Sequence, residues 1–336
     1  MKKMMMAACA IAMLGLFGCK KDNPTPDNGG QGGGGGDQFP TGEGIYNPSH
    51  KIATVSVDGT LSETWTWNDW QLVSITTEGD EGSTSTFEYE GYRLSSALSS
   101  FYGVPALLSY TYAGDKLSSI NAGNMAEIFV THNTAEKIDS LKIDMDPVMV
   151  NQLLNMLLSY MGNGGTKDFG SKLTVTSTDV AAALTWQGDN VSQMLLNGEI
   201  VGTATLGEIR SIINLDSLAG TYASLLSLLS DETLIPLTLV LNETTGFTYD
   251  NQHNPLCGFF GRLDPSMLSA SNITQQTTEG SVTITATLTT PLGNLSLPYT
   301  YDIPSSNQSL SYTYDNDGYP LTVTNGDGSV TSYTYK

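Results

Sequence analysis

A short pattern of aromatic and polar positions recurs along the chain from Ile45 onward. A typical copy has an aromatic residue, a Thr or Glu, a second aromatic residue, a turn of polar or glycine residues, and an aliphatic residue that restarts the pattern. Side chains of a strand point alternately to its two faces, so both aromatics share one face and the polar residue between them faces the other. Each copy therefore predicts a β-hairpin. The copies are Trp65-Thr66-Trp67 with Leu72, Phe87-Glu88-Tyr89 with Leu94, Tyr110-Thr111-Tyr112 with Leu117, Leu184-Thr185-Trp186 with Val191, Phe247-Thr248-Tyr249 with Leu256, Tyr312-Thr313-Tyr314 with Leu321, and Tyr333-Thr334-Tyr335.

Hairpins that follow one another with short connections build an antiparallel meander. A long meander twists and curls, and closing or nearly closing protects its edge strands. The sequence therefore predicts a mostly β fold. We expect one domain over residues 45–336, in which the meander curls into an open or closed barrel-like sheet.

Two segments depart from this pattern and predict helices. Apolar residues recur at helical spacing near 146–161, after an Asp-Pro pair and before a glycine. A second such stripe spans 216–230. Both stripes need an apolar partner surface, so we expect the two helices to pack on the concave side of the sheet.

The first eighteen residues have the features of an export signal. Lys2 and Lys3 precede an apolar run that is too short to span a bilayer and ends in Leu16-Phe17-Gly18-Cys19. This ending resembles the bacterial lipobox, although Phe17 departs from the usual small or β-branched residue. The resemblance implies that residues 1–18 are a lipoprotein signal peptide and that Cys19 carries the lipid. The alternative is an ordinary secretory peptide with an incidental cysteine.

Residues 19–44 have the composition of a flexible linker. Glycines and prolines dominate this stretch and leave almost no apolar surface to offset the entropy of ordering the chain. We therefore expect a lipid-anchored domain that is held away from the outer membrane and faces the periplasm or the cell exterior.

The charge balance narrows the range of partners. The chain has 34 acidic and 14 basic side chains, a formal net charge of -20. That charge opposes binding to nucleic acids and to anionic membrane surfaces. We expect contact with the membrane through the anchor at Cys19, and a glycan or an envelope protein as the other partner.

The last copy of the repeat carries a resemblance to known proteins. Tyr312-Thr313-Tyr314-Asp315-Asn316-Asp317-Gly318, with Tyr333 and Tyr335 one period later, resembles the tyrosine–aspartate (YD) repeat of secreted bacterial shell proteins. The lipobox, the glycine-rich linker and the aromatic hairpins together are similar to Bacteroidetes lipoproteins of a domain-of-unknown-function family described as porin-like in fold. The resemblance implies an extended β-meander and supplies no catalytic residues.

No local motif for catalysis, cofactor binding or a metal site stands out. The sequence has no GxSxG, HExxH, CxxC or P-loop pattern, so we expect no enzyme activity, no cofactor and no metal. Asp315, Asp317 and Asp327 offer oxygen ligands for Ca²⁺, but their spacing fits no complete calcium loop, and side-chain bonds within turns explain them equally well.

Two aromatic residues lie outside the paired positions and are candidates for ligand binding. Trp70 and Tyr92 each fall in the turn that follows a pair of aromatics. Such side chains suit stacking against sugar rings. We therefore predict a non-enzymatic binding module. The alternatives are a glycan-active hydrolase whose carboxylate pair comes from distant strands and a structural shell without a small ligand. The polar residues on the opposite faces of the strands argue against a transmembrane channel.

Overall fold

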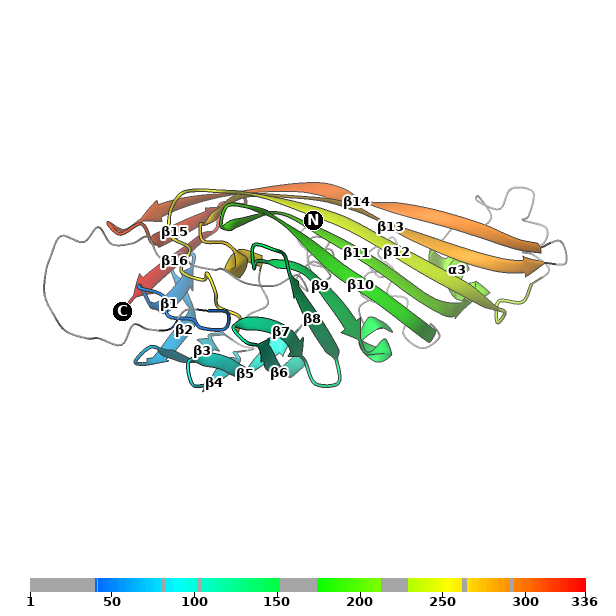
Figure 1. Cartoon of the computed structure of the whole chain (residues 1–336). Helices are drawn as coiled ribbons and strands as arrows, with labels where there is room; N and C mark the ends of the chain where they lie inside the picture. Colours follow the sequence, from blue (N-terminus) through cyan, green and yellow to red (C-terminus); the bar gives the residue numbers. More distant parts are fainter. Residues whose placement is uncertain are drawn as a thin grey trace, which may run out of the picture.

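The computed structural model describes residues 42–79, 82–101, 104–151, 174–212, 229–261, 265–290 and 293–336, together with Pro40. Within them, sixteen antiparallel strands follow one another in sequence order, and the last pairs with the first to close a barrel (Figure 1). The predicted mostly β meander is thus confirmed, and the sheet closes. Residues 1–39, which contain the predicted signal peptide, Cys19 and most of the linker, lie outside the described residues.

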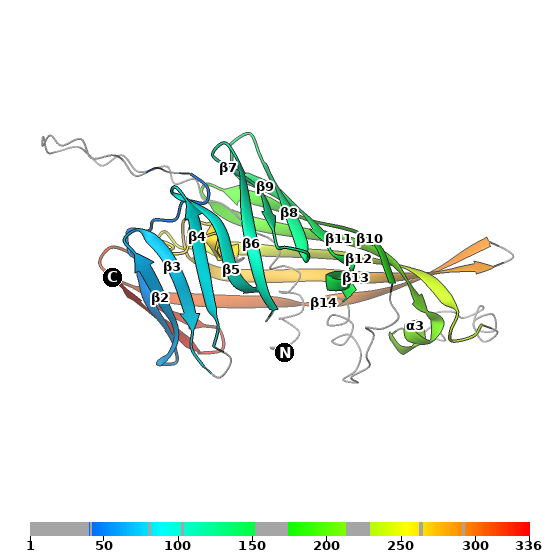
Figure 2. The ribbon, with the colours of Figure 1, turned by 90° about the horizontal axis from the view of Figure 1, so that it is seen from below.

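The strands fall into a short set and a long set. The first nine strands have 6–10 residues each: β1 (Ile52–Val57), β2 (Thr60–Asn68), β3 (Gln71–Thr77), β4 (Thr84–Glu90), β5 (Arg93–Phe101), β6 (Val104–Ala113), β7 (Lys116–Asn121), β8 (Ala126–His132) and β9 (Ile138–Met145). The long strands are β10 (Thr174–Gln187), β11 (Asn190–Thr205), β12 (Leu234–Tyr249), β13 (Ile273–Thr290) and β14 (Gly293–Tyr314), and β15 (Pro320–Asn325) and β16 (Val330–Tyr335) complete the barrel. Figure 2 shows the long strands extending well past the short ones on one side.

The hairpins of the repeat share an irregularity beside the second aromatic. In the pairing of β2 with β3, the register shifts between Thr66 and Trp67. Equivalent shifts occur just before Tyr89, Tyr112, His132, Trp186, Tyr249 and Tyr314. The extra residue of this bulge lies in the returning strand, so the first strand keeps its alternation. Trp65 is buried and Trp67 packs against the same core, so both face the interior as predicted.

In six of the seven copies, the polar tip of the second aromatic bonds to the start of an earlier strand; in the seventh, the first aromatic, Tyr312, donates to the carbonyl oxygen of Ile273 instead. Trp67 Nε1 donates a hydrogen bond to the carbonyl oxygen of Ile52 at 2.7 Å. Equivalent bonds run from Tyr89 to Leu72, Tyr112 to Leu94, Trp186 to Ile138, Tyr249 to Val191, and Tyr335 to Pro320. Each acceptor is the first or second residue of a strand. Since this position must donate a hydrogen bond from a largely buried site, it takes Tyr or Trp rather than Phe.

The segment between β12 and β13 closes one end of the barrel from inside. Phe259, Phe260, Met267 and Leu268 in this segment are fully buried, and the ring of Phe259 contacts the inward-facing ring of Trp65. We call residues 250–261 and 265–272 the plug; they include the short helix η2 (Pro265–Leu268). The predicted return of a strand at Leu256 is wrong, because the next strand begins at Ile273. The apolar pair Phe259-Phe260 gains more by burial in the barrel than a hairpin turn would give it.

The described residues include only parts of the two predicted helices. Residues 147–151 are helical, in agreement with the expected start of the first helix, but 152–161 and most of 216–230 lie outside the described residues. A helix that was not predicted, α3 (Leu206–Ile212), begins with a capping box in which the Thr205 hydroxyl and the Glu208 carboxylate bond reciprocally to backbone N–H groups. A search of the described residues for helices long and apolar enough to cross a membrane finds none.

The outer face of the barrel is polar where the repeat predicts it. The residues between the paired aromatics are all exposed: Thr66, Glu88, Thr111, Thr248 and Thr313. Hydroxyl pairs join neighbouring strands on this face, for example Thr313 with Thr322 and Thr283 with Thr300. The apolar core therefore lies inside the barrel.

Candidate functional site

The structure brings the two predicted ligand-binding residues together. Trp70 lies in the turn between β2 and β3, and Tyr92 lies in the turn between β4 and β5. Asp69 and Gly91, which precede them, have positive φ values of 55° and 61° and form these tight turns. The ring centroids of Trp70 and Tyr92 are 5.2 Å apart at an interplanar angle of 33°. Two turns that are separate in sequence therefore present one aromatic surface.

A third aromatic residue fixes the position of this pair. The ring of Tyr89 meets that of Trp70 edge-on, with centroids 5.4 Å apart. The Tyr89 hydroxyl donates to the carbonyl oxygen of Leu72, and burial of that hydroxyl raises the pKa of Tyr89 well above its usual value. We call Trp70, Tyr89 and Tyr92 the aromatic platform. Its outer member Tyr92 is 46% exposed, so the platform has a solvent-facing side supported by a half-buried tyrosine.

Charged groups around the aromatic platform are mostly acidic. Asp69 and Glu90 are exposed and flank the two turns. Arg93, which follows Tyr92, is paired with Asp115 and bonded to a backbone carbonyl, and its guanidinium lies over the ring of Tyr112. The positive charge of Arg93 is therefore balanced by Asp115. The carboxylates of Asp69 and Glu90 favour neutral or cationic ligands over anionic ones.

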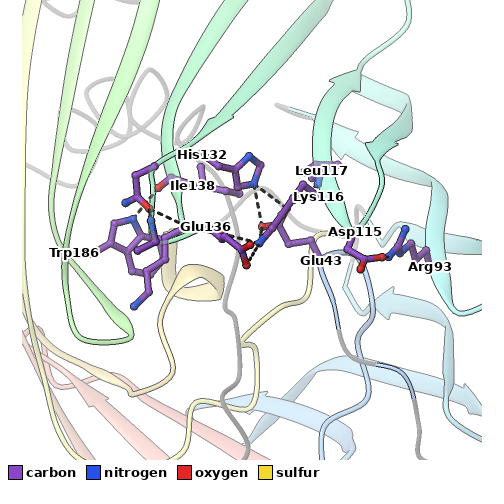
Figure 3. A network of polar contacts seen from close by, with 12 residues as sticks. Glu43, Arg93, Asp115, Lys116, Leu117, His132, Glu136, Ile138 and Trp186 are labelled. Atoms are coloured by element: carbon purple, nitrogen blue, oxygen red, sulfur yellow. Dashed lines mark hydrogen bonds and ion pairs between the residues drawn. The ribbon is translucent and has the colours of Figure 1, made fainter.

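A buried carboxylate lies at the same end of the barrel, in a network that the repeat pattern does not predict (Figure 3). Glu43 is 7% exposed, and both its oxygens lie 3.0 Å from His132 Nε2. Its Oε2 also accepts a hydrogen bond from the backbone N–H of Leu117 at 2.7 Å, and Lys116 Nζ is 3.7 Å from Oε1. The carboxylate thus joins the chain just before the barrel to β7 and β8.

This network occupies the place where the repeat lacks an aromatic residue. His132 precedes the turn of the β8–β9 hairpin, beside the same bulge as the second aromatics of the other copies. In those copies an aromatic donates to the start of an earlier strand, and here the second residue of β7, Leu117, donates its N–H to Glu43 instead. The sequence signal was Val130-Thr131-His132, a copy in which histidine replaces Tyr or Trp. Sequence reasoning missed it because the partner Glu43 is 89 residues away.

Residues next to Glu43 attach the same stretch to the barrel. The Gly44 carbonyl accepts a hydrogen bond from the Leu94 N–H, and a side chain at position 44 would collide with the hydroxyl of Tyr112. Tyr46 is buried and donates to the carbonyl of Pro255 in the plug. We call residues 42–46 the strap. The aromatic platform, the strap and the plug therefore share one end of the barrel.

The acidic turns near the C-terminus have local structural roles. Asp315 Oδ1 accepts from the N–H groups of Asp317 and Tyr319, and Asp327 Oδ1 accepts from Ser329, so both form side-chain-supported turns. His50 Nε2 is 3.3 Å from an Asp317 oxygen. Among the described residues, no group of three or more His, Cys, Asp or Glu side chains is arranged to hold a metal ion.

One acid inside the barrel has a shifted pKa. Burial raises the pKa of Glu243 on β12 to about 7. A two-carboxylate glycosidase needs a second carboxyl group nearby. In the described register, the inward residues next to Glu243 on β11 and β13 are Met194, Leu196, Gly198, Thr278, Gly280 and Val282, none of which is acidic. The adjacent strands therefore do not supply the carboxylate pair.

Comparison with known proteins leaves the family of the chain open. No protein-family model matches it, and none of the curated proteins does. Among solved structures, it is similar to one described as "Crystal Structure of TcdB2-TccC3-TEV", with 12% identity and a TM-score of 0.19. That match covers 81% of this chain and 16% of the other, and at this TM-score it carries no argument about fold or function.

Proposed function

We propose that this chain is a lipid-anchored protein of the cell envelope that binds neutral glycans, without enzymatic activity, at the aromatic platform. The single observation that carries the proposal is the pairing of Trp70 with Tyr92, whose rings lie 5.2 Å apart on two separate turns. Exposed aromatic rings stack on the apolar faces of sugars, and their polar tips bond to hydroxyl groups. The resemblance to envelope lipoproteins supports the cellular context of this proposal.

The surroundings of the aromatic platform favour an uncharged ligand. Asp69 and Glu90 lie beside it, and the nearby Arg93 is already bonded to Asp115. The chain as a whole carries a formal net charge of -20. Uronic acids, sialic acids and sulfated sugars would be repelled, whereas neutral hexose polymers would not.

Removing either outer ring of the platform is expected to abolish most glycan binding. We expect Trp70→Ala and Tyr92→Ala each to weaken binding about tenfold or more, because each removes one stacking surface while leaving the barrel core intact. The measurement is a glycan array followed by calorimetric titration of the best neutral oligosaccharide. Phe129→Ala is the matched control, because Phe129 is 42% exposed on the outer face of β8. Unchanged affinity in both platform variants would refute this site.

Membrane attachment is expected to depend on Cys19 alone. In cells, the wild-type protein should fractionate with membranes, and Cys19→Ser should release it in aqueous extracts, because the lipid is the proposed anchor and polar residues such as Thr66 and Thr111 alternate along the outer strand faces. Protease treatment of intact cells then separates a surface-facing domain, which is digested, from a periplasmic one, which is protected until lysis. A Cys19→Ser protein that still requires detergent for extraction would contradict anchoring by lipid alone.

A further inference from the structure

One oxygen of a buried carboxyl group on the inner wall of the barrel lacks a hydrogen-bond partner. Glu243 is 2% exposed, and its Oε2 atom bonds to no group in the part of the chain that the structure describes. Its Oε1 atom is 3.5 Å from the hydroxyl of Thr245, at the outer limit of a hydrogen bond. A buried carboxyl oxygen without a partner is costly, so such groups persist mainly where they serve a ligand or a reaction.

Two hydroxyl groups extend this carboxyl into a cluster of oxygens. Thr245 is 1% exposed, and its Oγ1 lies 3.4 Å from Oγ1 of Thr278 on the neighbouring strand β13. Glu243 itself is paired in register with Gly280, which places no side chain over the carboxyl. The two carboxylate oxygens of Glu243, which share the charge when the group is ionised, and two hydroxyl oxygens therefore lie along one patch of the inner wall.

The inward side chains beside this cluster are more exposed than those farther along β13. The inward residues Gln276, Thr278, Ser306 and Gln308 are partly exposed, whereas the inward residues farther along β13, Val282, Ile284 and Ala286, are fully buried. Of the three residues of the cluster, Thr278 is thus the one that borders solvent, whereas Glu243 and Thr245 lie beneath the surface of the wall.

We propose that Glu243, Thr245 and Thr278 form a binding site for a primary ammonium group. An ammonium group has three N–H donors and no acceptor, which suits a carboxylate that lies beside two hydroxyl oxygens. Its positive charge would compensate the buried carboxylate, and the net charge of -20 concentrates cations near the protein. The site is separate from the aromatic platform and does not depend on glycan binding.

The proposed site is selective for the ionised form of Glu243. Since burial raises the pKa of this carboxyl to about 7, an ammonium ligand binds more tightly at pH 8 than at pH 5.5. Binding of the cation in turn favours the ionised carboxylate and lowers its pKa.

The test compares two probes at pH 8 and equal ionic strength: methylammonium, which has three N–H donors, and tetramethylammonium, which has none. In the chain with Cys19→Ser, methylammonium should raise the midpoint of thermal unfolding in a saturable way by about 2–4 °C, and tetramethylammonium should not. Glu243→Gln should abolish this shift, and Thr245→Val should reduce it. Glu199→Gln, which changes an exposed acid on the outer face of β11, should preserve it.

Three results would overturn the proposal. They are the absence of a methylammonium shift in the parent chain, an equal shift with tetramethylammonium, and a full shift that survives Glu243→Gln. The unfolding midpoint of each variant without probe shows directly whether the variant folds, so a lost shift in a folded Glu243→Gln protein is attributable to the carboxyl group. Glycan binding by Trp70→Ala and Tyr92→Ala proteins is measured separately and has no bearing on this outcome.

Discussion

Replacing Glu43 by alanine is expected to lower the free energy of unfolding by about 2–4 kcal/mol, because it removes a buried carboxylate that is hydrogen-bonded to a backbone N–H and to a histidine ring. The substitution leaves the backbone N–H of Leu117 without its acceptor and removes the partner that lies 3.0 Å from His132 Nε2. An unsatisfied buried donor alone costs about 1–3 kcal/mol. The strap would also lose its deepest attachment to the barrel.

Urea unfolding of the chain with Cys19→Ser measures this loss, and two variants control for it. Glu136→Ala removes an exposed glutamate that also lies 3.7 Å from Lys116 Nζ, and exposed ion pairs contribute about 0–1 kcal/mol. Glu43→Gln keeps an oxygen for the Leu117 N–H and should lose less than Glu43→Ala. Limited proteolysis should cut the strap in the alanine variant before the barrel unfolds. A loss for Glu43→Ala no larger than that for Glu136→Ala would show that the network contributes little.

The local parts of the fold were predictable because their causes are local. Alternation along Trp65-Thr66-Trp67 was enough to place both rings inside and the threonine outside, and the bulge in each hairpin does not disturb this, since the extra residue lies in the returning strand. Turn residues such as Gly91 similarly identify the hairpin ends. The closure of β1 with β16 is different, because it depends on the summed twist and number of all strands and not on any single residue.

The parts that escaped prediction depend on contacts between distant residues. Phe247-Thr248-Tyr249 has the pattern of a hairpin, but the chain after Tyr249 enters the barrel because Phe259 can pack there against Trp65. Glu43 is isolated in a glycine-rich sequence, and only the folded chain brings it to His132. The aromatic platform is an intermediate case, since both turns were identified but the distance between Trp70 and Tyr92 required the register of β2 to β5.

Glu243 escaped prediction for a simpler reason, namely that one glutamate in a strand of alternating residues carries no sequence signal. Its neighbours Leu241 and Thr245 face the interior, and so does Glu243 by alternation. The sequence places Asp315, Asp317 and Asp327 in turns and Glu88 on an outer face, but no pattern distinguishes Glu243. The inward position of this one carboxyl makes the stability of the barrel depend on pH.

The stability of the barrel is expected to fall as the pH rises from about 4.5 to 7, and Glu243→Gln should remove this component. The folded state holds the proton of Glu243 up to a pKa of about 7, whereas the unfolded chain releases it near 4.5. Between these values the folded state binds more protons, so each increase in pH favours unfolding, and the full difference is about 3 kcal/mol. Urea unfolding at pH 5 and pH 8 gives the change in unfolding free energy for the parent chain and for Glu243→Gln. Subtracting the two changes isolates the contribution of Glu243, because the other titrating groups are common to both proteins. Glu199→Gln should follow the parent chain at both values, and parallel stability curves for the parent and Glu243→Gln would contradict a buried, ionisable carboxyl on this wall.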